Sequence, residues 1–127
     1  MTKQPLTLYF DGGARPNPGR IETAVFVRGA LHICDNHGVG SNDAAEWLAL
    51  LDAIEIARDI GATDIILRGD SMLVVNQASG RAKCRSPLLR PYLDAYTAQA
   101  AQFTRVRIRH IGRSQNHAGI ALDERRR

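Results

Sequence analysis

Long hydrophobic runs are absent from this sequence of 127 residues. No stretch approaches the roughly 18 consecutive apolar residues of a membrane-spanning helix, so we expect no membrane interaction. The first five residues also lack the apolar segment of a secretory signal peptide. Cysteine is scarce, and the two that occur, Cys34 and Cys84, form no C-x-x-C pattern. This usage favours two reduced thiols in a cytoplasmic protein.

Acidic residues are in the minority. Lys and Arg total 17 against 13 Asp and Glu, which gives a net charge of +4. This balance favours a polyanionic partner without establishing one. The length suffices for one hydrophobic core, and no linker, repeat or low-complexity segment divides it. We therefore expect residues 1–127 to form a single domain, and no pattern indicates an obligate protein partner.

Strand-like patterns dominate the first part of the chain and alternate with helical patterns afterwards. Pro16, Pro18 and the neighbouring glycines predict a loop directly after the first strand. Three strands followed by alternating helices and strands predict an α/β fold, a mixed five-stranded sheet with helices packed on it. The predicted strands cover residues 6–10, 23–27, 31–39, 64–69 and 105–110, and the predicted helices cover 43–58, 72–78, 88–102 and a short segment from 116.

Three acidic residues stand where predicted elements begin or end. Asp11 ends the first strand, Glu46 begins the longest helix, and Asp70 follows the fourth strand. Each alone would suit an ordinary turn or helix terminus. Carboxylates placed at strand ends can also converge and hold hard divalent cations, which prefer oxygen ligands. Together they suggest metal-assisted phosphodiester hydrolysis.

Four local motifs resemble those of type 1 ribonuclease H, a family grouped with reverse-transcriptase-like domains. They occur in the family's order and extend over nearly the whole chain. The motifs are Asp11-Gly12-Gly13 followed by Asn17-Pro18-Gly19; Ser41-Asn42-Asp43-Ala44-Ala45-Glu46; Asp70-Ser71; and His110-Ile111-Gly112-Arg113 followed by Asn116. The resemblance implies a ribonuclease H-like fold whose mixed five-stranded sheet has the order 3-2-1-4-5.

The resemblance also implies an activity, namely hydrolysis of the RNA strand of RNA/DNA hybrids to give 5′-phosphate products. Two Mg²⁺ or Mn²⁺ ions are expected, with Asp11 bridging them, Glu46 and Asp70 completing one site, and His110 assisting. His110 would equally suit a strand-capping role. Contacts to the hybrid are expected from seven residues: Gly12, Gly13, Asn17, Ser41, Asn42, Asp43 and Ser71.

The match fails at the family's last motif, Asn-x-x-Ala-Asp-x-Leu, whose Asp is the fourth metal ligand. Here Asn116 and Leu122 align, but Ile120 stands where that carboxylate belongs. If the segment is helical, Asn116 or Asp123 lies one turn away and could substitute, or the ligand is absent. The alternative function is a hybrid-binding module that has lost catalysis. His32 and His37 show no ligand spacing and are interpreted as structural.

Overall fold

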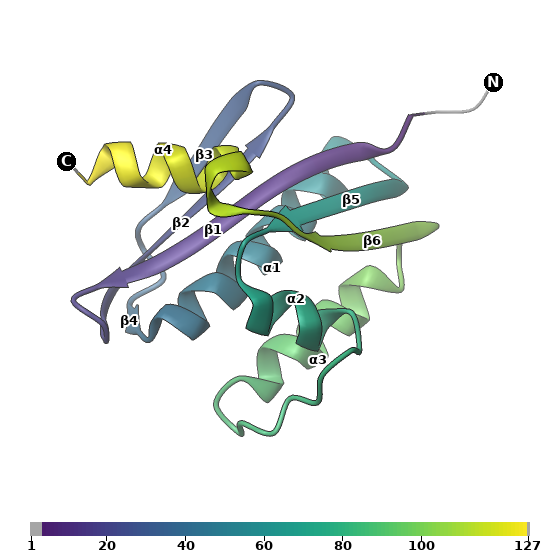
Figure 1. Ribbon diagram of the computed structural model, residues 1–127. Helices are drawn as coiled ribbons and strands as arrows, with labels where there is room; N and C mark the ends of the chain where they lie inside the picture. Colours follow the sequence, from purple (N-terminus) through teal and green to yellow (C-terminus); the bar gives the residue numbers. More distant parts are fainter. Residues whose placement is uncertain (1–3, 127) are drawn as a thin grey trace.

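A mixed β-sheet forms the middle layer of the computed structural model, which describes residues 4–126 (Figure 1). Residues 1–3 and 127, on which the signal-peptide and C-terminal helix predictions partly depend, lie outside the described residues. The elements in chain order are β1 (Leu6–Arg15), β2 (Gly19–Val27), β3 (Ala30–Cys34), β4 (Val39–Gly40), α1 (Asn42–Ile60), β5 (Asp64–Gly69), α2 (Met72–Ala78), α3 (Arg90–Ala100), β6 (Arg105–His110), a 3₁₀ turn η1 (Arg113–Gln115) and α4 (His117–Arg125).

The strands follow the order β3-β2-β1-β5-β6, with β1 in the centre. β1 pairs antiparallel with β2 and parallel with β5, and the outer pairs are β2 with β3 and β5 with β6. The predicted fold class is confirmed, but the sheet has a sixth short strand, because the strand expected over 31–39 is interrupted. The polar turn at residues 35–38, where Gly38 has a φ of 93°, separates β3 from β4. β4 then pairs with the start of β2.

β1 is longer than predicted. The loop expected from residue 12 begins only after Arg15, because residues 11–15 pair with residues 20–24 of β2. The prediction that Asp11 ends a strand is therefore wrong, since Asp11 lies inside β1. Local glycine and proline content suggested a loop there, but a neighbouring strand supplies hydrogen-bond partners that local sequence does not reveal.

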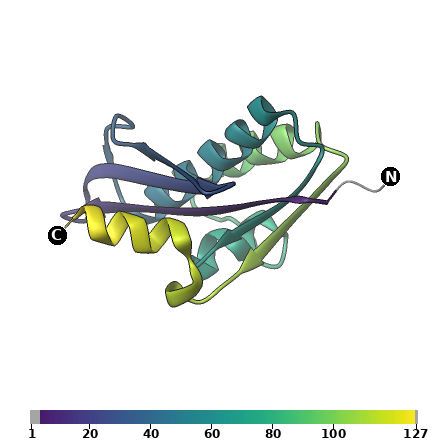
Figure 2. The ribbon, with the colours of Figure 1, turned by 90° about the horizontal axis from the view of Figure 1, so that it is seen from above.

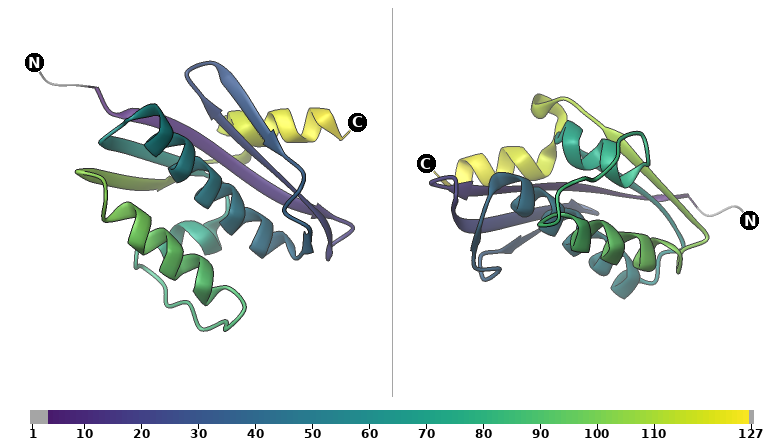
Figure 3. Two further views of the ribbon diagram at one scale, coloured as in Figure 1. Left: turned by 180° about the vertical axis from the view of Figure 1, so that it is seen from behind. Right: turned by 90° about the horizontal axis from the view of Figure 1, so that it is seen from below.

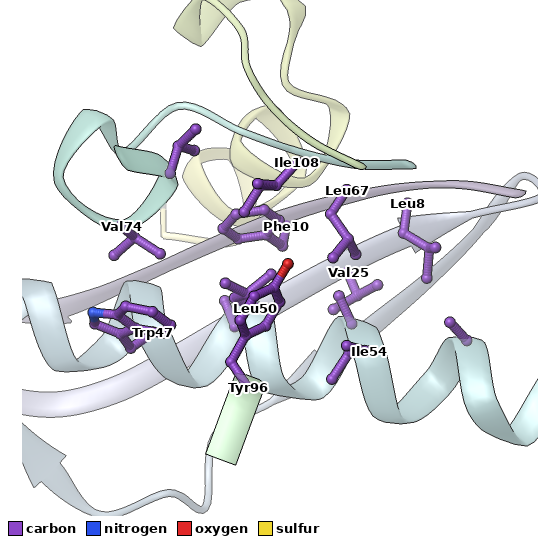
Figure 4. Close-up of a cluster of buried hydrophobic side chains, with 14 of the residues drawn as sticks. Leu8, Phe10, Val25, Trp47, Leu50, Ile54, Leu67, Val74, Tyr96 and Ile108 are labelled. Carbon is purple, nitrogen blue, oxygen red and sulfur yellow. The ribbon is translucent and has the colours of Figure 1, made fainter. Parts of the chain in front are cut away.

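Helices cover both faces of the sheet. α1, α2 and α3 lie on one face and α4 lies alone on the other (Figures 2 and 3). Ser41 precedes α1 and caps it, because its side chain accepts from the Ala44 N–H. Gly61 follows the helix in a left-handed conformation with a φ of 87°. Its apolar side packs Trp47, Leu50 and Ile54 against side chains of the central strands (Figure 4).

β2 is also longer than predicted, since it begins at Gly19 rather than at Thr23. The other helix and strand bounds follow the sequence patterns closely. α2 and β6 occupy the predicted residues, α1 is slightly longer than predicted, and α3 is shorter at both ends. Both cysteines are free, as expected. None of the helices formed by residues 4–126 is long and apolar enough to cross a membrane.

Candidate active site

The three predicted acids converge at one place. Asp11, Glu46 and Asp70 each offer a carboxylate oxygen, and these oxygens lie within 4.8 Å of one another. They come from the interior of β1, the early part of α1 and the residue after β5. Asp11 is only 2% exposed, and all three line a groove of about 520 Å³. Segments distant in sequence thus bring three oxygen ligands to one open groove.

Two glycines allow this convergence. A Cβ on Gly12 would lie 2.1 Å from the carbonyl oxygen of Ala45, so α1 can approach β1 only because residue 12 has no side chain. The Gly12 N–H donates to Glu46 Oε1 at 2.7 Å, which fixes that carboxyl beside Asp11. Gly69 has a similar role for Asp70, because its missing Cβ would lie 2.4 Å from the Phe10 ring.

The cluster carries more negative charge than a buried site tolerates without a cation. Burial, followed by the charge of Asp11, raises the pKa of Glu46 to about 9, against the opposing hydrogen bond from Gly12. Burial also raises the pKa of Asp11, although Arg113 partly offsets this effect. A donor set made only of carboxylate oxygens suits a hard divalent cation. These residues therefore fit Mg²⁺ or Mn²⁺.

Arg113 supplies positive charge to this cluster. Its Nη1 donates to Asp11 Oδ1 at 2.7 Å and to Asp70 Oδ2 at 2.9 Å. Its Nη2 donates to Asp123 Oδ1 at 2.9 Å. Partial burial alone would lower the pKa of Arg113, but the bonds to Asp11 and Asp70 raise it above its usual range. Sequence reasoning placed Arg113 in a family motif yet gave it no role, because its partners Asp11 and Asp70 lie 102 and 43 residues away in the sequence.

The guanidinium has room because residue 119 is glycine. A Cβ on Gly119 would lie 2.7 Å from Arg113 Nη1. Gly119 occupies the Ala position of the family motif, directly before Ile120, where the family has Asp. Ile120 is 40% exposed and does not line the groove, whereas Asp123 does. The carboxylate that α4 presents to the groove is thus one helical turn after the expected position.

Asn116 and His110 differ from the other predicted residues. Asn116 is fully buried and donates from Nδ2 to the Phe10 carbonyl at 3.0 Å and to Asp70 Oδ2 at 2.9 Å. Its Oδ1 accepts from the Ala118 N–H and caps α4. In this geometry Asn116 holds Asp70 in place and offers no free oxygen to a cation. His110 is exposed at the end of β6, opposite Gly69, and does not line the groove.

Most of the residues predicted to contact a hybrid surround the three acids. Six line the groove: Gly12, Gly13, Asn17, Asn42, Asp43 and Ser71. Ser41 does not, and serves as the cap of α1. Ser71 also caps a helix, α2. Asn42 Oδ1 accepts from the Ala14 N–H at 2.8 Å, and Asn17 Oδ1 accepts from the Asn42 N–H at 3.0 Å.

These asparagine contacts fasten the start of α1 to β1 and to the turn that follows it. Two basic residues that sequence reasoning did not single out, Arg15 and Arg126, also line the groove. Positive side chains at the edge of an acidic centre are suited to phosphate oxygens.

Comparison with known proteins agrees with this architecture. The reverse transcriptase-like family matches residues 27–123. A ribonuclease HI of Halobacterium salinarum is 38% identical over 119 residues, which are 90% of this chain and 60% of that relative. The chain therefore spans less than two thirds of that relative's length.

Two solved structures share the fold. The crystal structure of RNase H1 from Halobacterium salinarum superposes with a TM-score of 0.87 at 32% sequence identity, covering 95% of this chain and 99% of that one. LC11-RNase H1, solved in complex with an RNA/DNA hybrid, gives a TM-score of 0.81 at 28% identity, with 92% of each chain covered. The likeness extends over the sheet and the helices that carry the groove residues.

Proposed function

Because this chain belongs to the reverse transcriptase-like family and has the ribonuclease H fold, we propose that it is a metal-dependent endonuclease acting on RNA/DNA hybrids. It would hydrolyse the RNA strand and leave 5′-phosphate products. The observation that carries the proposal is the convergence of Asp11, Glu46 and Asp70 in one groove. The hybrid complex of LC11-RNase H1, a protein of the same fold, supports the choice of substrate.

Asp11, Glu46 and Asp70 would hold the divalent cations, and Asp11 would be a ligand to both. When bound, such ions activate a water and stabilise the leaving oxygen. Asn116 orients Asp70 through its amide, and the Gly12 N–H orients Glu46. His110 would assist from the end of β6. The exposed asparagines and Arg15 would contact sugar and phosphate groups, which position a duplex without reading its sequence.

Asp123 would provide the fourth carboxylate that Ile120 does not. It lines the groove, and it reaches the other acids through a shared hydrogen-bond partner, Arg113. Release of Arg113 would leave Asp11, Asp70 and Asp123 free of its hydrogen bonds at once, since one guanidinium joins all three. The chain would thus keep four acids near the groove, with the last one supplied by a different turn of α4.

Two free thiols suit a reducing compartment, so we place the activity in the cytoplasm. A labelled RNA/DNA hybrid incubated with Mn²⁺ tests the proposal, beside an Asp11→Asn variant checked for folding by circular dichroism. We expect cleavage of the RNA strand by the native chain and loss of at least a hundredfold in the variant.

Cleavage that survives Asp11→Asn would remove this residue from the centre of the site. A second outcome is tight binding of the hybrid without cleavage in the presence of Mg²⁺ or of Mn²⁺. That result would identify the chain as a binding module that has lost catalysis with its fourth family carboxylate.

A further inference from the structure

A second set of metal-ligating side chains lies away from the acidic groove, between the end of β3 and α1. Cys34 Sγ, a ring nitrogen of His37 and an Asp52 carboxylate oxygen lie within 4.8 Å of one another. Cys34 ends β3, His37 lies in the turn that follows, and Asp52 projects from the middle of α1. Sequence analysis interpreted His37 as structural, but the Cys34-x-x-His37 spacing places both side chains over the same helix.

The contacts of His37 and Asp52 hold these two groups in place, while the Cys34 thiol donates to Asn36 Oδ1. His37 Nε2 and Asp52 Oδ2 are hydrogen-bonded at 2.8 Å. Thr23, which is 1% exposed, donates from its hydroxyl to Asp52 Oδ2 at 2.7 Å and so orients that carboxylate. Thr23 is also the cross-strand partner of Cys34. The His37 and Asp52 side chains are each 22% exposed, so an ion can reach them while they stay ordered by packing.

The groove beside Cys34, His37 and Asp52 is lined by acidic side chains. A groove of about 190 Å³ borders the cluster, and Asp52, Glu55 and Asp59 of α1 line it together with Cys34. No lysine or arginine of the described chain is among its lining residues. A cation entering from this groove therefore meets carboxylates on one wall and a thiol on the other.

The ligand types differ from those of the acidic groove. Sulfur, imidazole nitrogen and one carboxylate oxygen are the donors that Zn²⁺ takes, whereas Mg²⁺ and Ca²⁺ take oxygen alone. Because Zn–S bonds are about 2.3 Å long and Zn–N bonds about 2.0 Å, two ligand atoms of a tetrahedral ion lie roughly 3.5 Å apart. The His37–Asp52 pair, now 2.8 Å apart, would open slightly to admit the ion, and small side-chain movements would exchange this hydrogen bond for two metal bonds.

We propose that Cys34, His37 and Asp52 form a binding site for Zn²⁺ or a similar borderline-soft divalent cation, separate from the acidic groove. Water or Glu55 would supply the fourth ligand, since Glu55 lines the groove and follows Asp52 by three residues on α1. On binding, the Cys34 thiol loses its proton to solvent, and the proton on His37 Nε2 moves to Nδ1 by exchange with solvent, so that Nε2 is free to bind the ion. The ion would tie the turn at residues 35–38 to α1, so it would stabilise the edge of the sheet rather than take part in hydrolysis.

Co²⁺ is the probe, because thiolate coordination to Co²⁺ produces a near-ultraviolet charge-transfer band that carboxylates do not. The full chain is reduced, freed of metal and titrated with CoCl₂. We expect the band to saturate at one ion per chain and to disappear when Zn²⁺ is added. Cys34→Ser should abolish it and His37→Gln should weaken binding at least tenfold.

Two matched variants should retain the band. Cys84→Ser removes the other thiol, which lies elsewhere in the core, and Asp11→Asn disables the acidic groove. A native chain that shows no band, or a band that survives Cys34→Ser, would overturn the proposal. Circular dichroism of each variant establishes that it is folded, and His37→Gln provides an independent test if Cys34→Ser is not.

Discussion

Arg113 is the point at which the site can be tested most directly. Replacing it by alanine removes the cation that joins Asp11, Asp70 and Asp123. Loss of one partner from a fully buried ion pair costs about 3–5 kcal/mol, and loss of an exposed pair costs about 1 kcal/mol or less. The Asp11 side chain is 3% exposed but that of Arg113 is 47% exposed, so solvent screens the interaction from one side.

We therefore expect Arg113→Ala to lose about 2 kcal/mol of unfolding free energy in a chelating buffer. For a domain of this size, that corresponds to a fall in Tm of roughly 8 °C. Arg90→Ala is the matched control, because Arg90 makes an exposed pair with Asp94 on α3. Such a pair contributes about 0.5 kcal/mol or less, so its removal should change Tm by no more than about 2 °C.

Addition of Mn²⁺ should then distinguish the variants. A divalent ion at the three acids replaces the charge that Arg113 supplies, so Mn²⁺ should raise the Tm of Arg113→Ala more than that of the native chain. Thermal unfolding with and without Mn²⁺ measures both effects. Equal Tm values for the Arg113 and Arg90 variants in chelator would refute the stabilising role of Arg113. An equal Mn²⁺ response in the native chain and Arg113→Ala would refute the competition between the guanidinium and the ion.

Two further substitutions test α4, one within the helix and one at its partner Glu22 on β2. Asp123→Asn should lower the rate of hybrid cleavage by roughly tenfold or more while leaving Tm nearly unchanged. Glu124 is the exposed neighbour of Asp123, and Glu124→Gln should change neither the rate nor Tm. Equal cleavage rates for the two variants would exclude Asp123 as the fourth acid. Burial alone would raise the pKa of Glu22, but hydrogen bonds and charges from Arg125 and Arg126 lower it below its usual value. Because the folded pKa is depressed, this stabilisation is present above the unfolded pKa and disappears as pH falls through the folded one. Glu22→Gln should therefore lower stability at pH 7 by about 1 kcal/mol, and acid denaturation profiles should show the difference disappear as pH falls through the depressed folded pKa of Glu22.

Local signals account for the elements that sequence patterns placed well. Ser71 caps α2 and the alternation of residues 105–110 defines β6, so their bounds follow from neighbouring residues alone. The predicted end of the first strand is wrong because the second half of β1 is a strand only through its pairing with β2. Glycine is a poor strand former in isolation, yet Gly12 is required there by the carbonyl of Ala45.

The residues of the site likewise include some that sequence motifs identify and others whose positions depend on packing between distant segments. Motifs identified Asp11, Glu46 and Asp70, and the structure brings all three together. Arg113 and Gly119 could not be assigned, because the guanidinium position depends on the packing of η1 and α4 against β1. The arrangement of Cys34, His37 and Asp52 likewise depends on how β3 lies over α1.

The unequal support of the two walls of the groove has a consequence for motion. α1 is anchored by the main core, whereas α4 rests on a smaller cluster, in which Tyr9, Phe26 and Ile33 pack against Ala24, Ala118 and Leu122, and on the pair of Arg125 with Glu22. Free energies of local opening follow such differences in buried apolar contact. Amide hydrogens of α4 should therefore exchange with solvent much faster than those of α1. Each opening would withdraw Arg113 and Asp123 together while Asp11, Glu46 and Asp70 remain in place, so the groove can exchange its occupants without unfolding the sheet that carries it.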